Sequence, residues 1–206
     1  MPERALIVVD IQNDFMPDGA LPVRDGYDVV PVVNALMETF DLVVATQDWH
    51  PADHGSFASN HEGHAPGDVI DLHGLDQILW PDHCVQETAG AEFVDGLNRG
   101  GIDRVFQKGT DPDIDSYSGF FDNGHRKDTG LGDFLKEQGV EAVWVCGVAT
   151  DYCVKYTVLD ALRLDFETYL VVDGCRGVEQ NAGDVDRAIA EMRDAGAHVT
   201  GSDEVT

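Results

Sequence analysis

Short apolar runs that end in polar residues or glycine recur along the chain and predict buried β-strands. These runs are rich in β-branched residues and almost continuously apolar, which is typical of strands that are covered on both faces of a parallel sheet. Five runs are clear and a sixth is weaker; they cover residues 5–10, 42–48, 104–109, 142–147 and 169–174, and then 197–200.

Between these runs, apolar residues recur at the spacing of an amphipathic helix. The helical segments are 29–40, 131–138, 154–162 and 185–192, and glycines at 139 and 196 end two of them. Because predicted strands and helices alternate, we expect an α/β fold with right-handed crossovers. It should have three layers, with a central, mainly parallel six-stranded sheet flanked by helices.

One long segment, about 49–90, breaks this alternation. It has little periodicity, contains several glycines and prolines, and holds most of the histidines of the chain. A loop of this length inside a compact domain is either functional or disordered, and its histidines favour a function. The length of 206 residues, without a linker or internal repeat, predicts a single domain over 1–206.

The charge of the chain limits its partners. With 39 acidic and 13 basic residues, its net charge is −26, which repels phosphate backbones and argues against nucleic acid. Acidic residues such as Asp111, Asp113 and Asp115 could form a receptor for cations. The interpretation that we prefer is a solvated acidic surface suited to a high-salt cytosol, where salt screens the repulsion between like charges.

Apolar segments of the chain are too short for a membrane protein. No run approaches the roughly 20 residues that span a bilayer. The first strand begins almost at the N-terminus, without the basic region and cleavage site of a signal peptide. We therefore expect a cytoplasmic protein with no membrane partner.

Reactive side chains lie where the predicted strands end. Asp10, Asp48, Lys108 and Asp173 end four strands, and Cys153 begins the helix after 142–147. Ligands of open α/β sheets bind outside the carboxyl ends of the strands. These five side chains are therefore expected on one rim of the sheet.

Cys153 is the candidate nucleophile among four cysteines. At the start of a helix, the macrodipole and free N–H groups are expected to lower the pKa of the thiol and to offer a site for an oxyanion. A reducing cytosol argues against disulfides. Cys84, Cys146 and Cys175 are interpreted as small buried hydrophobic residues.

Asp10 and Lys108 each allow two interpretations. Asp10 follows five apolar residues and is either a desolvated proton acceptor or a cap of the turn at Asn13. Lys108 alone could be an edge residue whose ammonium reaches solvent. Together with Cys153, they provide a nucleophile, its base and a charge stabiliser.

A divalent metal site is predicted at the start of the long segment. Asp48 and His50, two residues apart in an extended chain, point to the same side, and a distant His83 could complete an Asp/His/His site. Four further residues in the segment could supply another ligand: His54, His61, Glu62 and His64.

Six motifs, in order along residues 4–199, resemble the nicotinamidase/pyrazinamidase family of the isochorismatase-like cysteine hydrolases. They are IVVDIQNDF (7–15), ATQDWHP (45–51), WPDHC (80–84), KG (108–109), DSYS (115–118) and GVATDYCV (147–154). The resemblance implies the isochorismatase-like hydrolase fold. Two features depart from the family pattern: Tyr152 stands where some relatives have histidine, and residues 61–79 are longer than in compact members.

The resemblance also implies roles for individual residues. Cys153 matches the nucleophile, Asp10 its base and Lys108 the third catalytic residue. The matched metal ligands are Asp48, His50 and His83, with zinc the usual ion and iron or manganese in some members. Further matches are a cis peptide bond at Val148–Ala149, an oxyanion hole from the N–H groups of Ala149 and Cys153, and a pyridine pocket lined by Phe15, Trp80, Tyr117, Val148 and Ala149.

The reaction implied by the resemblance is hydrolysis of nicotinamide to nicotinate and ammonia through a Cys153 thioester. The ring nitrogen binds the metal, pyrazinamide is a related substrate, and the product enters NAD salvage. The protein could also form a homo-oligomer. The main alternative is a related cysteine amidohydrolase acting on a carbamoyl or ureido compound. Isochorismate hydrolysis, a metal-activated water as nucleophile and a non-catalytic binding protein stay open.

Overall fold

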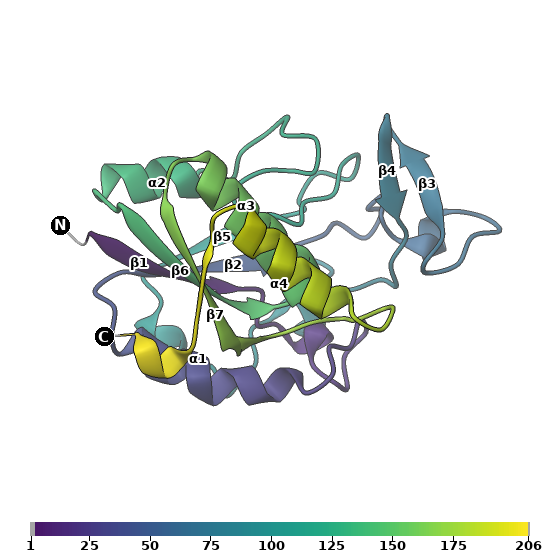
Figure 1. Ribbon diagram of the computed structural model, residues 1–206. Helices are drawn as coiled ribbons and strands as arrows, with labels where there is room; N and C mark the ends of the chain where they lie inside the picture. The colour runs from purple at the N-terminus through teal and green to yellow at the C-terminus, as the bar shows by residue number, and fades with distance from the viewer. Residues whose placement is uncertain (1–2, 206) are drawn as a thin grey trace.

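The centre of the molecule is a six-stranded sheet in which all pairings are parallel. The computed structural model describes residues 3–205. The strands follow the spatial order β5-β2-β1-β6-β7-β8 (Figure 1). Their bounds are β1 Arg4–Val9, β2 Val43–Asp48, β5 Arg104–Lys108, β6 Ala142–Val148, β7 Glu167–Arg176 and β8 His198–Thr200. The predicted sheet and its strands are confirmed.

Helices cover both faces of the sheet, as predicted. Helix α1 (Val29–Met37) packs against one face, and α2 (Leu131–Glu137), α3 (Lys155–Arg163) and α4 (Asp184–Asp194) lie on the other (Figure 1). From β1 the chain adds β2 and then β5 on one side of β1. It then crosses back and adds β6, β7 and β8 on the other side. The direction therefore reverses between β1 and β6, which is where such sheets place their ligand sites. No helix within 3–205 is long and apolar enough to cross a membrane.

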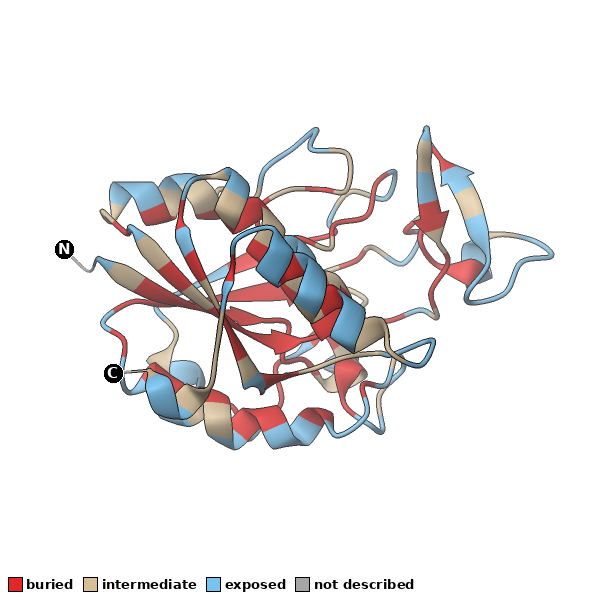
Figure 2. Cartoon of the chain, viewed as in Figure 1, coloured by how far each residue is buried: buried red, intermediate tan, exposed pale blue. Residues whose placement is uncertain are grey.

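The middle strands form the core because both of their faces are covered. Five residues of β1 and all six of β2 are buried (Figure 2). Strand β6 approaches β1 closely at Gly147, where an added Cβ would lie 2.1 Å from the carbonyl oxygen of Val9. Gly147 also has a φ of +121°, so glycine is required by both space and backbone conformation.

The long segment contains a β-hairpin that the sequence did not predict. Strands β3 (Val69–Leu72) and β4 (Leu75–Ile78) pair antiparallel and project from the body of the molecule (Figure 1). His73 and Gly74 connect them with φ values of +51° and +87°, the left-handed pair of a two-residue hairpin turn. The segment is thus ordered, and one part of it is regular structure.

Candidate active site

Four of the five predicted rim residues meet at the carboxyl ends of the central strands. Asp10 follows β1, Asp48 ends β2 and Lys108 ends β5. Asp48 and Lys108 are direct partners in the β2–β5 register, so their side chains emerge next to each other. Cys153 approaches them from the short π-helix Thr150–Val154, which leads from β6 into α3.

Asp173 does not join this group, so its predicted place on the rim is wrong. Strand β7 continues three residues beyond it to Arg176, past an irregularity in its pairing with β6. The Asp173 side chain is exposed and accepts hydrogen bonds from the backbone N–H and the hydroxyl of Ser202. It therefore fastens the C-terminal segment to the sheet.

Lys108 is the centre of the catalytic group and is completely buried. Its Nζ lies 2.9 Å from Asp10 Oδ2, 2.7 Å from Asp48 Oδ1 and 3.5 Å from Cys153 Sγ, and it donates to the carbonyl of Ser116 at 3.0 Å. Burial lowers the pKa of Lys108, but the charges of Asp10 and Asp48 outweigh burial and raise it well above its usual value. The side chain is therefore a fixed positive charge between two carboxylates, not an edge residue.

The environment of Asp10 favours the proton-acceptor interpretation. Its carboxylate accepts a hydrogen bond from Thr46 Oγ1 at 2.7 Å and faces Lys108, rather than capping the turn at Asn13. Asp10 is fully buried and has a φ of +49°. Burial raises its pKa, and the positive charge of Lys108 offsets only part of this shift. A carboxylate with a raised pKa is suited to take and return a proton near neutral pH.

Cys153 lies within reach of this base, although its thiol is not pre-ionised. Its Sγ and carboxylate oxygens of Asp10 and Asp48 all lie within 4.8 Å of one another. Burial raises the pKa of Cys153 well above its usual value, and Lys108 only partly opposes this. The shift is opposite to the predicted lowering, because burial and the negative charges of Asp10 and Asp48 raise the pKa more than Lys108 lowers it. A neutral thiol at rest makes a nearby proton acceptor necessary.

Asp48, His50 and His83 form a buried cradle of metal-ligating atoms. His50 Nε2 lies 3.5 Å and His83 Nε2 3.8 Å from Asp48 Oδ2. The other ring nitrogens, Nδ1, contact the carbonyls of Gly109 at 2.8 Å and Pro81 at 2.7 Å. Since a carbonyl only accepts, both Nδ1 atoms carry a hydrogen, and both Nε2 atoms face Asp48. This is how histidines are held for a zinc ion.

The pKa shifts in the cradle favour the metal-binding forms of Asp48 and His83 but not of His50. Burial, aided by the charge of His50, lowers the pKa of His83 to about 4, which keeps its ring neutral. Burial raises the pKa of Asp48, but Lys108 and His50 outweigh it and the pKa falls below its usual value. Burial lowers the pKa of His50, but Asp48 outweighs burial and raises it, so a metal would have to displace a proton from His50.

Among the four further candidate ligands, His54 lies nearest to the cradle, with its ring centroid 4.3 Å from that of His50. Its Nδ1 accepts a hydrogen bond from the N–H of Ser56 at 3.2 Å, so Nε2 carries the hydrogen in the neutral ring and has no lone pair for a cation. His61 instead contacts the carbonyl of Gly55, while His64 and Glu62 are exposed. The cradle therefore consists of Asp48, His50 and His83.

Gly109 sets the position of His50. An added Cβ at this residue would lie 2.3 Å from His50 Cε1, and its φ is +64°. Because the carbonyl of the same residue accepts from His50 Nδ1, the backbone both orients the ring and contacts its edge. The Lys108–Gly109 pair of the sequence therefore serves the catalytic group and the cradle together.

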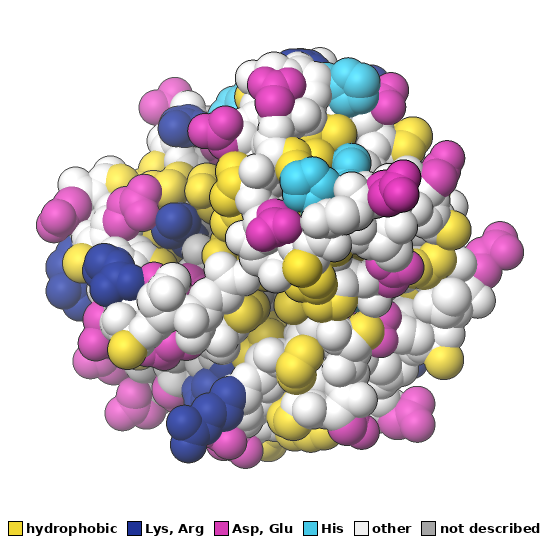
Figure 3. Space-filling model, turned by 90° about the vertical axis from the view of Figure 1, so that its right-hand side faces the viewer, with side chains coloured by type: hydrophobic (Ala, Val, Ile, Leu, Met, Phe, Trp, Pro, Cys, Tyr) yellow, Lys and Arg dark blue, Asp and Glu magenta, His cyan; other side chains and the backbone are white. Residues whose placement is uncertain are grey.

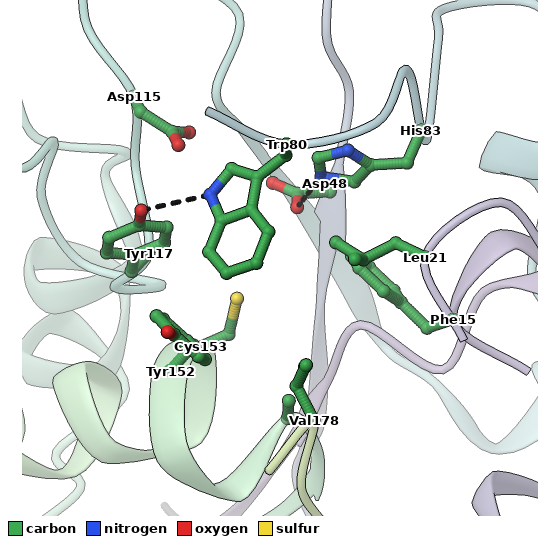
Figure 4. Close-up of a pocket in the computed structure, with 11 residues that line it drawn as sticks. Phe15, Leu21, Asp48, Trp80, His83, Asp115, Tyr117, Tyr152, Cys153 and Val178 are labelled. Atoms are coloured by element: carbon green, nitrogen blue, oxygen red, sulfur yellow. Dashed lines mark hydrogen bonds and ion pairs between the residues drawn. The ribbon is translucent and has the colours of Figure 1, made fainter. Parts of the chain in front are cut away.

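A narrow pocket connects Cys153 with Asp48 and His83 of the cradle (Figure 4). Four of the five predicted pocket residues line it: Phe15, Trp80, Tyr117 and Ala149. Val148 is fully buried and is not among the lining residues, so its place in the substrate site stays a prediction. The sequence prediction did not include Leu21, Asp115, Tyr152 and Val178 among the lining residues.

Aromatic rings give the cavity flat apolar walls. Trp80 Nε1 donates to the hydroxyl of Tyr117 at 3.1 Å, and Trp80 meets Tyr152 edge to face with centroids 4.9 Å apart. In Figure 4 the Cys153 sulfur lies on one side of the Trp80 ring, with Asp48 and His83 on another. The Val148–Ala149 peptide bond is cis, as predicted, and Ala149 lines the cavity beside Cys153. This arrangement suits a flat ring that has one polar group near Cys153 and another near the cradle.

Comparisons with known proteins find relatives that match almost the whole chain. A model of the isochorismatase domain matches residues 4–204. The nicotinamidase of Escherichia coli (strain K12) is 50% identical over 203 residues, which cover 96% of this chain and 94% of that protein. A solved nicotinamidase/pyrazinamidase of Acinetobacter baumanii has a TM-score of 0.96 at 42% identity, covering 100% of this chain and 99% of that one. The pyrazinamidase of Pyrococcus horikoshii in complex with zinc has a TM-score of 0.79 at 42% identity, covering 97% and 99%.

Proposed function

Because the chain belongs to the isochorismatase domain family, we propose that it hydrolyses nicotinamide to nicotinate and ammonia. The observation that carries this proposal is the pocket lined by Cys153, behind which Lys108 and Asp10 lie, and by Asp48 and His83 of the Asp/His/His cradle. Pyrazinamide has the same ring shape and is a second expected substrate. We further propose that the reaction serves NAD salvage in the cytoplasm.

The reaction begins with a proton transfer that the buried thiol requires. Asp10 takes the proton from Cys153 Sγ, and the thiolate attacks the carboxamide carbon. Negative charge that develops on the carboxamide oxygen is received by the N–H groups of Ala149 and Cys153, a contribution of about 3–4 kcal/mol for each donor. Asp10 then returns the proton to the departing nitrogen, ammonia leaves, and a thioester with Cys153 remains.

Hydrolysis of the thioester uses the same residues in reverse. Asp10 takes a proton from the incoming water, the water oxygen bonds to the acyl carbon, and the sulfur leaves with a proton as nicotinate is released. Lys108 stays charged throughout, because its raised pKa keeps the proton on Nζ. Its position between Asp10 and Cys153 stabilises whichever of the two is negative.

Asp48, His50 and His83 would hold a divalent cation, for which we propose Zn²⁺. When bound, the cation supplies a Lewis-acid position that the ring nitrogen of the substrate can occupy, which orients the carboxamide toward Cys153. The His83 and His50 rings, fixed through their Nδ1 atoms, would present Nε2 to the cation, a donor atom that zinc prefers, with His50 releasing a proton on binding.

The decisive experiment measures ammonia release from a panel of amides, with protein as isolated and after treatment with a chelator. We expect release from nicotinamide and pyrazinamide, and a rate at least about 100-fold lower for benzamide, which lacks the ring nitrogen. Chelator treatment should lower the nicotinamide rate, and added Zn²⁺ should restore it. Release from an N-carbamoyl amino acid but not from nicotinamide would contradict the proposed substrate.

The acidic surface leads to a second proposal, that the protein works at high salt. Acidic side chains are spread over the face in Figure 3, in keeping with the net charge of −26. At molar KCl the Debye length falls to about 3 Å, so repulsion between exposed carboxylates is largely screened. We expect ammonia release to persist at molar KCl and the melting temperature to rise with salt. Sucrose, which does not screen charge, is the control, and unfolding by KCl would contradict the proposal.

A further inference from the structure

A buried carboxylate beside the cradle has no part in the reaction described above. Asp115 is 3% exposed, and one of its oxygens lies within 4.8 Å of ring nitrogens of both His50 and His54. Its hydrogen-bond donors are two neutral groups, the N–H of Ser116 at 2.7 Å and Nε2 of Gln77 at 3.1 Å. A carboxylate taken out of water and given only neutral donors is costly unless a positive charge lies near it.

Gln77 reaches Asp115 because the hairpin places it there. It lies on β4, is 2% exposed, and its Nε2 contacts three oxygens: the carbonyl of Ile78 at 2.7 Å, Asp115 Oδ2 at 3.1 Å and the hydroxyl of Tyr117 at 3.2 Å. One amide group therefore joins the carboxylate beside the cradle to the aromatic wall of the cavity. The hairpin therefore contributes a buried side chain, Gln77, to the site, although its outer residues are exposed.

The formal charges of the buried site indicate what Asp115 balances. Lys108 neutralises one of the two carboxylates that it contacts, Asp10 or Asp48, and leaves one negative charge. A divalent cation in the cradle would then give the buried group one positive charge in excess. The carboxylate of Asp115 removes this excess. Without it, the cation would be held in a buried site with an uncompensated charge.

We infer that Asp115 is a positioning residue of the cation site, where it balances the second charge of a divalent ion, and that the β3–β4 hairpin supplies Gln77 to fix its orientation. This inference rests on the metal site of the proposed function, and not on the identity of the substrate. Groups that surround metal ligands in this way typically contribute about 10- to 100-fold to metal affinity.

The test is a zinc titration of metal-free protein against a chromophoric chelator. Asp115→Asn keeps the size of the side chain and removes its charge, and we expect the Kd for Zn²⁺ to rise about 10- to 100-fold. Gln77→Met should raise the Kd less, in the same direction. Asp113→Asn is the matched control: it makes the same charge change two residues away on an exposed side chain, and its Kd should stay that of the wild type.

Melting of the metal-free proteins separates this role from a structural one. Asp115→Asn removes a buried charge at the expense of one hydrogen bond, so the metal-free variant should melt close to the metal-free wild type. Zinc should stabilise the variant less than the wild type. A large loss of melting temperature without metal would show a structural role and overturn the inference.

The remaining outcomes are also decisive. If Asp115→Asn binds zinc as tightly as the wild type, the role of Asp115 is refuted and the proposed metal site is unaffected. Failure of the wild type to bind zinc would refute the metal site and this inference with it. If the Kd pattern holds while nicotinamide is not hydrolysed, the inference stands and the proposed substrate fails.

Discussion

Replacing Cys153 with alanine is expected to abolish ammonia release from nicotinamide while the protein still folds and binds Zn²⁺. Without the sulfur no thioester can form, and the loss of a catalytic nucleophile lowers the rate by about 10⁴- to 10⁶-fold. The zinc cradle contains no atom of Cys153, so the Kd for Zn²⁺ in the chelator titration should change little. The rate is measured as ammonia released per enzyme under saturating nicotinamide.

Cys146→Ala is the matched control for this prediction. Cys146 lies buried in β6, where its Sγ contacts the carbonyl of Ile7, away from the cavity. Its removal should cost about 1–2 kcal/mol of unfolding free energy and leave the rate nearly unchanged. Turnover retained in Cys153→Ala would show that a metal-activated water, and not the thiol, attacks the substrate.

Lys108→Met is expected to damage both stability and catalysis. Methionine keeps most of the buried apolar stem but removes the ammonium that separates Asp10 from Asp48. Breaking a buried ion pair in this way leaves uncompensated charge and costs about 3–5 kcal/mol of unfolding free energy. The pKa of Asp10, already raised by burial, should then rise further, so that the carboxyl is protonated near neutral pH. A base that holds its proton costs about 10²- to 10⁴-fold in rate.

Urea unfolding and ammonia release, both measured with zinc present, test these two effects. Lys127→Met provides the control, because the Lys127 side chain is 70% exposed and pairs with Asp111 at the surface. Its effect on unfolding should stay within about 1 kcal/mol, the range of exposed ion pairs. A Lys108→Met protein as stable and as active as Lys127→Met would contradict the arrangement of charge described for the site.

The sheet and its reactive edge were predictable because burial leaves a direct pattern in the sequence. Strands β1 and β2 are covered on both faces, so β1 is apolar from Ala5 to Val9 and β2 from Val43 to Ala45, and polar residues appear as the chain reaches the rim at Asp10 and Asp48. The placement of Lys108 followed from the same rule. Contact among side chains that lie at positions 10, 48, 108 and 153 then follows from the parallel order of the strands.

Other features carry no local pattern and were missed. The hairpin strands are four residues long and half exposed, so their apolar residues do not form a continuous run. Asp115 follows Asp111 and Asp113 in an acidic stretch, and nothing in that stretch distinguishes a buried carboxylate from solvated ones. Asp173 was misplaced because β7 continues through an irregular pairing. The pKa of Cys153 depends on how deeply the folded chain buries the thiol, which its position on a helix does not reveal.

The ion pair between Asp48 and Lys108 joins two strands that are 60 residues apart in the chain, and Lys108 is a further 45 residues from Cys153. Contacts of such long range form late, because the entropy of closing large loops must be overcome before they are made. A form of the chain in which these strands have not yet paired would have no working thiol. Recovery of turnover during refolding reports the final assembly of the whole sheet rather than any single segment.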